Sequence, residues 1–344
     1  MTVPVAARPS PGSSTTPLLE VSDLRVEFAG RNNRPVHAVR GLNYHINPGE
    51  SLGLVGESGS GKSVSAMSLL GLLPKKSSKV TSGSAVFEGH DLIGMADEDM
   101  RKVRGARIAM IFQDPLASLN PVLTIGRQIT EQLETHKGTG KAASRKRAVD
   151  LLTMVGIPGA SQRVDDYPHQ FSGGLRPRAM IAMALSCEPA LLIADEPTTA
   201  LDVTIQAQIL ELLRSLKDEL GMALLLITHD LGVVAGFVDR LAVMYAGEII
   251  ETGPTEPVLA NPFHPYTLGL LRSLPRLDRP RQIALTPIEG SPPDLSSKLV
   301  GCPFRPRCPY GVDECSVDDP KLTLVTPNHF AACWNPQGEP EVAQ

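Results

Sequence analysis

A glycine-rich octapeptide that follows a short apolar run is the feature that most constrains the fold of this chain. The apolar run spans residues 52–55. The octapeptide consists of Gly56, Glu57, Ser58, Gly59, Ser60, Gly61, Lys62 and Ser63. This spacing is typical of a P-loop, in which a strand leads into a phosphate-binding turn and then into a helix.

The P-loop predicts a nucleotide site with defined roles for its residues. Its glycines let successive backbone N–H groups turn towards phosphate oxygens, and the N-terminus of the next helix adds to the attraction. Lys62 would reach the β- and γ-phosphates, and the hydroxyl of Ser63 would ligate Mg²⁺. We therefore expect ATP and Mg²⁺ to bind here.

Four apolar runs predict the core of the fold. They span residues 52–55, 108–112, 191–194 and 224–227. Nearly continuous apolar runs are what a sheet covered by helices on both faces requires of its strands. Residues 206–220 repeat apolar side chains with a helical period. The predicted class is α/β with a largely parallel sheet.

An Asp-Glu pair ends the third of these runs. Asp195 and Glu196 would therefore lie at the carboxyl edge of the sheet, where open α/β sheets bind their ligands. Asp195 is expected to hold the Mg²⁺ coordination sphere. Glu196 is expected to orient or deprotonate the attacking water.

Composition limits where in the cell we expect this chain and which partners we expect it to bind. Of the 344 residues 42% are hydrophobic, but no run of about 18 apolar residues predicts a membrane-spanning helix. The first residues show no secretory signal. A net charge of −4 argues against a protein held to nucleic acid mainly by bulk positive charge. We expect a chain that stays in the cytosol and has no nucleic-acid partner.

Composition and periodicity divide the chain into three parts. Residues 1–17 are rich in Pro, Ser and Thr and are expected to form a disordered tail. Residues 18–255 form the α/β domain, with a helical insertion at about 114–180 and a hairpin at 241–252. Residues 256–344 are rich in proline, which predicts an irregular C-terminal appendage.

Further motifs follow the P-loop in a fixed order. They are Gln113 after an apolar run; Phe171, Ser172, Gly173 and Gly174; Ala200, Leu201 and Asp202; and Thr228, His229 and Asp230. Together with the P-loop and the Asp-Glu pair, this ordered set resembles the nucleotide-binding domain of ABC ATPases over roughly residues 18–255.

The resemblance implies a role for each matching residue. Gln113 matches the glutamine that senses Mg²⁺ and the γ-phosphate, and His229 matches the switch histidine that contacts the γ-phosphate. Asp202 matches the residue that links the two ATP sites across a dimer. Phe28, an aromatic residue before the P-loop, is a candidate to stack on adenine.

The signature motif carries the clearest departure from the family. Residues 172–174 match the part that caps ATP bound to the opposite subunit. Leu175 stands where glutamine is most usual, and Pro177 replaces a residue that is commonly polar. Proline is tolerated in the first turn of a helix, so we expect the helix to survive.

Two C-terminal segments resemble those of oligopeptide and dipeptide importer ATPases. Residues 261–267 contain the sequence His264, Pro265, Tyr266, and residues 301–309 carry two cysteines. Importers for nickel or oligosaccharides share these features. The resemblance implies a peripheral ATPase at the cytoplasmic face of the membrane. Its expected partners are two transmembrane permease subunits, a second, paralogous ATPase and an extracytoplasmic substrate-binding protein.

Two other classes of ABC protein fit the sequence less well than an importer. Non-transport ABC ATPases of DNA repair or translation usually carry two nucleotide domains or a long inserted coiled coil, and neither is visible in this sequence. A non-hydrolysing regulator would lack the catalytic site, and Glu196 and His229 argue against it.

Four of the five cysteines fall within 32 residues, at Cys302, Cys308, Cys315 and Cys333. Disulfides are uncommon in the cytosol, whereas four thiolates suit Zn²⁺ or an iron–sulfur cluster. No two of these cysteines have the two to four intervening residues usual in zinc sites. The family resemblance points to a [4Fe-4S] cluster, with zinc and unligated thiols as alternatives. Cys187 is expected on the helix after the signature, as a small core residue.

Overall fold

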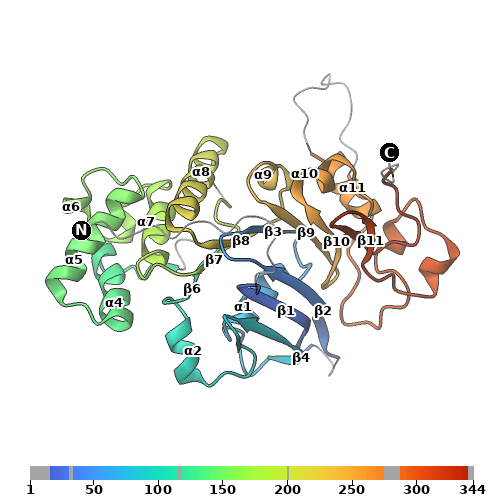
Figure 1. The fold of residues 1–344 in the computed structure, drawn as a ribbon, viewed down its shortest axis with the longest axis horizontal. Helices are drawn as coiled ribbons and strands as arrows, with labels where there is room; N and C mark the ends of the chain where they lie inside the picture. Colours follow the sequence, from blue (N-terminus) through green and yellow to red (C-terminus); the bar gives the residue numbers. More distant parts are fainter. Residues whose placement is uncertain (1–15, 31–33, 115–117, 200, 275–286, 340–344) are drawn as a thin grey trace.

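The computed structural model describes residues 16–30, 34–114, 118–199, 201–274 and 287–339 (Figure 1). Most of the predicted tail, residues 1–15, and Ala200 of the third motif therefore lie outside the described residues. No helix in the described ranges is both long enough and apolar enough to cross a membrane.

An eight-stranded sheet forms the centre of the molecule, in the order β11-β12-β10-β9-β3-β8-β7-β6. Its parallel part comprises β6 (Ile108–Ile111), β7 (Leu191–Asp195), β8 (Ala223–Thr228), β3 (Ser51–Val55) and β9 (Arg240–Tyr245). Its antiparallel part comprises β10 (Glu248–Pro254), β12 (His329–Ala331) and β11 (Thr323–Thr326). The predicted α/β class is confirmed, as is the hairpin, which β9 and β10 form.

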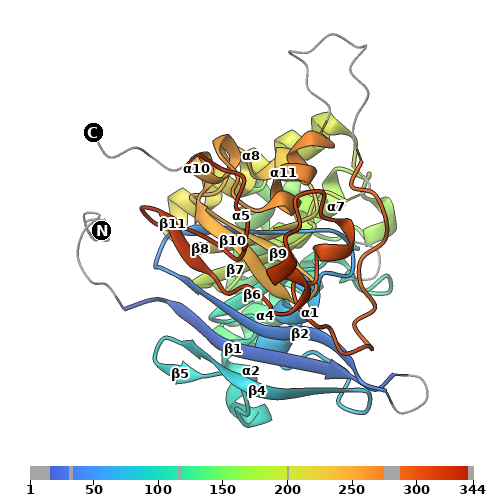
Figure 2. The ribbon, with the colours of Figure 1, turned by 90° about the vertical axis from the view of Figure 1, so that its right-hand side faces the viewer.

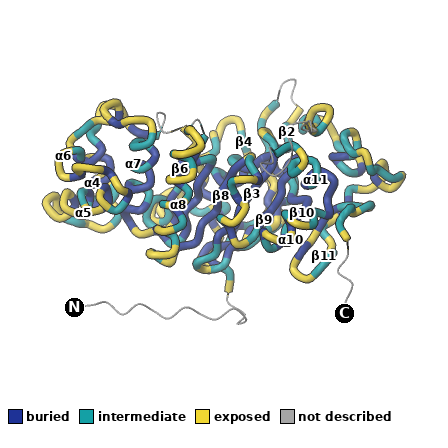
Figure 3. Tube along the Cα trace, turned by 90° about the horizontal axis from the view of Figure 1, so that it is seen from above, coloured by how far each residue is buried: buried dark blue, intermediate teal, exposed yellow. Residues whose placement is uncertain are grey.

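Burial explains why the parallel strands are continuous apolar runs. Every residue of β3, β7 and β8 is buried. Figure 3 shows the buried trace along these central strands and the exposed trace on loops and outer helical turns. Strands packed on both faces cannot alternate polar with apolar side chains, so the runs read from the sequence correspond to real strands.

A second, antiparallel sheet was not predicted. It has the order β2-β1-β4-β5 and consists of β1 (Leu19–Phe28), β2 (Val36–Ile46), β4 (Ser78–Phe87) and β5 (His90–Asp91). In Figure 2 it lies below β9 and β10 as a separate layer. Leucines of β1 and β3 share one buried cluster with Ala66 and Leu69 of α1 (Lys62–Leu69), so this helix packs between the two sheets.

A group of helices lies to one side of the sheets, between β6 and β7 (Figure 1). It contains α4 (Ile125–Lys137), α5 (Lys141–Met154), α6 (Ala160–Arg163), the short helix η2 (Pro168–Gln170) and α7 (Leu175–Ala184). Thr124 caps the start of α4 by accepting a hydrogen bond from the Arg127 N–H. Cys187 is buried in this core as predicted, but it lies three residues beyond α7 rather than on the helix.

Two further helices complete the parallel part of the fold. They are α8 (Val203–Leu220) and the short α9 (Leu231–Val234). The predicted helical stretch at 206–220 is confirmed by α8, which ends where Gly221 adopts a left-handed conformation with φ 65°. Between β5 and β6 lies α2 (Asp97–Val103).

The C-terminal appendage is more regular than its proline content predicted. It contains α10 (Thr255–Ala260), α11 (Pro265–Arg272), the single turns η3 (Arg305–Arg307) and η4 (Asp313–Ser316), and the strands β11 and β12. Glu251 and Thr252 of β10 pair with Ala331 and Phe330 of β12. The appendage thus extends the main sheet. The sequence does not predict this extension, because its two strands are short and lie in a proline-rich region.

A fully buried carboxylate fastens the appendage to the sheet. Glu251 of β10 accepts hydrogen bonds from the backbone N–H groups of Phe263 (2.6 Å) and His264 (3.0 Å). Its Oε1 also lies 2.8 Å from Nε2 of His329 on β12. Because burying a polar group is costly unless it is hydrogen-bonded, this one side chain holds the three segments together.

The His-Pro-Tyr segment has a structural explanation at the start of α11. His264 is the N-cap residue, and its Nδ1 accepts a hydrogen bond from the Tyr266 N–H at 3.0 Å. Pro265 occupies the first turn, where its missing N–H has no intrahelical partner. Burial lowers the pKa of His264 to about 3, so the imidazole is neutral and free to accept.

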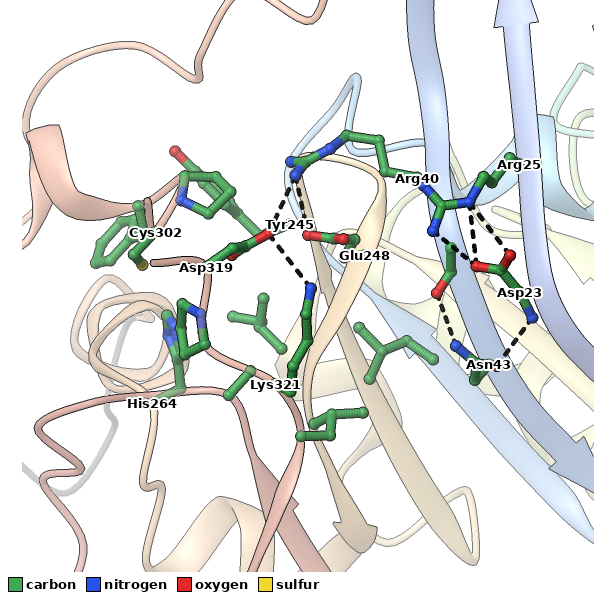
Figure 4. A pocket seen from close by; sticks show the side chains of 18 residues that line it. Asp23, Arg25, Arg40, Asn43, Tyr245, Glu248, His264, Cys302, Asp319 and Lys321 are labelled. Atoms are coloured by element: carbon green, nitrogen blue, oxygen red, sulfur yellow. Dashed lines mark hydrogen bonds and ion pairs between the residues drawn. The ribbon is translucent and has the colours of Figure 1, made fainter. Parts of the chain in front are cut away.

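A second junction lies beside a cavity of about 410 Å³ between β2, the hairpin of β9 and β10, and the appendage (Figure 4). Arg40 of β2 reaches both Glu248 (3.3 Å) and Asp319 (3.2 Å), and Lys321 lies 3.8 Å from Asp319. Burial raises the pKa of Glu248 to about 7. The charge of Arg40 opposes this shift, and the charge of Asp319 adds to it.

The raised pKa of Glu248 predicts a pH-dependent stability. The folded state favours the protonated form of Glu248. The stabilisation of the folded state by this proton is therefore complete below about pH 4.5 and is lost as the pH rises through about 7. Glu248→Gln cannot ionise and should gain stability relative to the natural protein by up to about 3 kcal/mol between these pH values. Denaturant unfolding at pH 5 and pH 8 would measure this difference. Glu219→Gln, at an exposed position, is the control. If Glu248→Gln changed the free energy of unfolding equally at both pH values, the raised pKa of Glu248 would be contradicted.

Candidate active site

Four neighbouring parallel strands deliver their carboxyl ends to one edge of the sheet. The strands β3, β8, β7 and β6 lie side by side, and all four run in the same direction. The P-loop follows β3, His229 follows β8, Glu196 follows β7, and Gln113 lies two residues beyond β6. Segments far apart in the chain therefore meet at the edge that the sequence predicted.

The P-loop is shaped by glycines at positions that a side chain could not occupy. Gly61 has φ 103°, and a Cβ atom there would lie 2.3 Å from the carbonyl oxygen of Ala38. A Cβ atom at Gly56 would lie 2.1 Å from the carbonyl oxygen of Met244. The loop is consequently pressed against β2 and β9, and its conformation is fixed by its surroundings.

Lys62 is the first residue of α1 and is buried within the loop. Its Nζ donates to the carbonyl oxygens of Gly56 (2.7 Å) and Glu57 (2.9 Å). Burial lowers the pKa of Lys62, and the negative charges of Glu196, Asp195 and Glu57 oppose this effect. The ammonium group is thus held inside the P-loop by backbone carbonyls.

Ser63 and Asp195 meet where the sequence placed a magnesium site. The Ser63 Oγ donates to Oδ1 of Asp195 at 2.9 Å. Burial raises the pKa of Asp195, and the hydrogen bond from Ser63 opposes that shift. A hydroxyl and a carboxylate side by side fit Mg²⁺, which takes one or two protein ligands and completes its shell with water and substrate phosphates.

Glu196 is held by polar groups from three different strand ends. Its Oε2 accepts hydrogen bonds from Gln113 Nε2 and from Thr199 Oγ1, each at 2.8 Å. Its Oε1 lies 3.0 Å from Nδ1 of His229. The backbone of Glu196 is left-handed, with φ 46°, a strained conformation of the kind found at functional sites.

The surroundings of Glu196 keep its carboxylate ionised. Burial raises its pKa, but hydrogen bonds from His229 and Thr199, together with the charge of Lys62, outweigh burial and leave the pKa below its usual value. Sequence reasoning missed Thr199. The only local signal was a hydroxyl three residues after the glutamate.

The signature segment lies on the helical side of the molecule. Ser172 and Gly173 are exposed, and Gly174 precedes the first residue of α7. Within the described residues no hydrogen bond joins residues 172–174 to the P-loop. Asp202 is the N-cap of α8 and accepts a hydrogen bond from the Ile205 N–H at 3.0 Å.

The departures at the signature are accommodated by the helix. Pro177 is buried in the first turn of α7, so the prediction that the helix survives is confirmed. Leu175 packs partly against the main buried cluster rather than offering a side-chain amide. Phe28 ends β1 and packs partly against the second buried cluster, which leaves its role toward adenine a prediction.

The four C-terminal cysteines are neighbours in the appendage. The Cys302 N–H donates to the carbonyl of Cys315 at 2.9 Å. Burial, together with the nearby thiols of Cys302, Cys308 and Cys315, raises the pKa of Cys333 to about 12. None of the described residues, however, form a group of three or more His, Cys, Asp or Glu side chains that could hold a single metal ion. Among the described residues, neither the [4Fe-4S] cluster nor its zinc alternative is therefore shown.

Family models match two segments of the chain. The model of the ABC transporter matches residues 39–199, and that of the oligopeptide/dipeptide transporter C-terminal region matches residues 250–315. The first match contains the P-loop and Glu196, and the second contains the His-Pro-Tyr segment.

Curated relatives match nearly the whole chain. The dipeptide transport ATP-binding protein DppD of Bacillus subtilis is 51% identical over 317 residues, covering 92% of this chain and 94% of the relative. The oligopeptide transport ATP-binding protein OppD of the same organism is 49% identical over 319 residues, covering 93% and 89%. A probable peptide ABC transporter ATP-binding protein of Sinorhizobium fredii is 51% identical, covering 92% and 94%.

Solved structures agree with this grouping. A dimeric ATP-binding cassette in a post-hydrolysis state with ADP and phosphate has a TM-score of 0.62 and 28% identity, covering 69% of this chain and 98% of that chain. Another is cbiO1 of Clostridium perfringens, with a TM-score of 0.60 and 30% identity, covering 71% and 91%. The motifs, the geometry at the sheet edge and these similarities agree, and the chain belongs to the ABC transporter ATP-binding proteins and is an ATPase of that family.

Proposed function

We propose that this chain hydrolyses ATP to energise the import of peptides through an ABC transporter. The observation that carries the proposal is the union of the ionised Glu196 site with a C-terminal region of the oligopeptide/dipeptide transporter type. Relatives that are about half identical over most of the chain are named as peptide, dipeptide and oligopeptide transport proteins.

The residues at the sheet edge have complementary tasks in hydrolysis. Lys62 and the backbone N–H groups of the P-loop bind the phosphates, and Ser63 and Asp195 would hold Mg²⁺, which neutralises phosphate charge when bound. Glu196 accepts a proton from the attacking water, because its carboxylate is ionised and partly enclosed. Gln113 and His229 orient that carboxylate and respond to the γ-phosphate.

The exposed signature supports action as a pair of ATPase subunits. Ser172 and Gly173 face solvent, and an added Cβ atom at Gly173 would meet nothing within 4 Å. Such a surface is open to a nucleotide bound by a second ATPase subunit. The altered residues Leu175 and Pro177 fit a pair of unlike subunits, so the proposed partner is a paralogue.

A groove beside Gln113 supports docking of permease subunits. It has a volume of about 240 Å³ and is lined mainly by apolar side chains, among them Leu72, Met110, Phe112 and Met183. Leu72 and Phe112 are 39% and 38% exposed, so two large apolar side chains of this groove are available to a partner. A permease segment that moved in this groove would displace Gln113, which donates a hydrogen bond to Glu196. The chain would then act peripherally at the cytoplasmic face of the membrane, with an extracytoplasmic binding protein supplying cargo.

The cysteines support a further part of the proposal, a [4Fe-4S] cluster held by Cys302, Cys308, Cys315 and Cys333. A cluster is larger than a single ion, so its thiolates stand further apart than the ligands of a metal ion. The four thiols are half-buried or buried, and each lies close enough to the others to affect ionisation. A structural role in the appendage follows from this placement.

Replacing the proposed general base tests the catalytic assignment. Glu196→Gln keeps the shape of the side chain but cannot accept a proton, so ATP should still bind while turnover falls by about two to four orders of magnitude. ATP hydrolysis and nucleotide retention in the complete transporter would measure both effects. Glu211→Gln, on the exposed face of α8, is the control. Near-normal hydrolysis by Glu196→Gln would refute the role.

Reconstitution tests the cargo and the partners. Vesicles containing this chain, its permease subunits and the native partner ATPase should hydrolyse ATP severalfold faster when a peptide-loaded binding protein is present. Native mass measurement should find one copy of this chain and one paralogue. Stimulation by nickel or oligosaccharide alone would replace the peptide assignment, and two identical ATPase chains would refute the unlike pair.

Anaerobic purification tests the cluster. The protein should be brown, absorb broadly near about 400 nm and contain about four irons per chain. Cys302→Ser should lose iron and colour, whereas Cys187→Ala, which changes a core cysteine outside the group, should retain both. Colourless protein with one zinc per chain would show that the metal assignment is wrong.

A further inference from the structure

Glu57, the second residue of the P-loop, forms hydrogen bonds with two side chains of the C-terminal appendage. The two terminal nitrogens of Arg307, Nη1 and Nη2, donate to the Glu57 carboxylate at 2.6 Å and 2.9 Å. The hydroxyl of Tyr266 accepts a hydrogen bond from the Glu57 N–H at 2.8 Å. Side chain and backbone of one P-loop residue are therefore fixed by parts of the chain more than 200 positions away.

The surroundings make these contacts rigid. The Arg307 side chain is only 4% exposed, and its Nε donates to the carbonyl of Glu289 at 3.0 Å. Its guanidinium lies 5.9 Å from the ring centroids of both Tyr245 and Phe304. Tyr266 is fully buried, with its ring 4.6 Å from that of Tyr245. A bidentate contact from a buried guanidinium fixes orientation as well as distance, which a pair of exposed side chains does not.

Glu57 passes this constraint to the lysine that faces the phosphates. Lys62 Nζ donates to the carbonyl oxygens of Gly56 and Glu57. Glu57 is also the residue that Arg307 and Tyr266 contact. A shift of Glu57 would move one of the two carbonyls that orient the ammonium group. Small displacements of a group that binds substrate have large effects on affinity and rate.

We propose that Arg307 and Tyr266 are positioning residues for ATP, and that the appendage sets the affinity of the P-loop for MgATP through Glu57. The chain of contacts runs from the cysteine segment to Arg307, from Arg307 to Glu57, and from Glu57 to Lys62. The inference rests on the proposed ATP site but is independent of the transported cargo. It gives the appendage a function at the nucleotide rather than at the partner subunits.

Two substitutions test the inference with little change in shape. Tyr266→Phe removes only the hydroxyl that accepts from Glu57, and Arg307→Lys keeps the charge but loses the two-pronged contact. In the full-length chain each should raise the equilibrium Kd for MgATP by about ten- to hundredfold. The matched controls are Tyr310→Phe and Arg272→Gln, which break a hydrogen bond between two appendage residues, at 3.1 Å, and should leave the Kd unchanged.

A double substitution separates positioning from stability. Arg307→Gln and Glu57→Gln should each weaken MgATP binding, and the two together should weaken it no more than either alone, since both remove the same contact. Thermal unfolding measured in parallel shows whether each variant is folded at the assay temperature. An unchanged Kd in folded Tyr266→Phe and Arg307→Lys, with only a lower Tm, would overturn the proposal, as would additive effects in the double variant. Neither result would bear on whether peptides are the cargo.

Discussion

Parallel pairing of β3 with β8, and of β8 with β7, is the constraint on which the rest of the site depends. The pairing aligns Val55 with Thr228, and Asp195 with Ile227, so the chain leaves all three strands at one level of the sheet. The P-loop, His229 and Glu196 then emerge beside one another without any long side chain having to reach across the fold. Apolar packing on both faces holds the strands in this register, because a slip would move the polar strand ends into the core.

The second organising element is the attachment of the appendage. The buried Glu251 binds the backbone before α11 and the imidazole of His329, which fixes both the helix and β12 against β10. With α11 in place, Tyr266 points at Glu57 and packs on Tyr245. The His-Pro-Tyr segment thus combines a helix cap, a helix start and a contact to the P-loop in three successive residues.

Charged groups have different surroundings at the nucleotide edge of the sheet and at the junction with the appendage. At the nucleotide edge, Asp195, Glu196 and Lys62 have hydrogen-bond partners within the site, and the charge of Lys62 favours the ionised form of both carboxylates. At the junction beside Arg40, one guanidinium contacts two carboxylates, and burial raises the pKa of Glu248 despite that contact. The first arrangement keeps charge available for chemistry, whereas the second makes the attachment of the appendage sensitive to pH.

The amino-acid sequence alone predicts the local features: the P-loop from the spacing of its glycines and Lys62, the buried strands from their apolar runs, and the placement of Glu196 from the strand before it. It did not reveal the antiparallel sheet, although β1 alternates buried and exposed residues, because a bulge around Asp23 interrupts the pattern. Nor did it reveal that Tyr266 and Arg307 meet Glu57 across separations of 209 and 250 residues. Such contacts follow from how the sheet and the appendage pack, and local residue patterns carry no information about that packing.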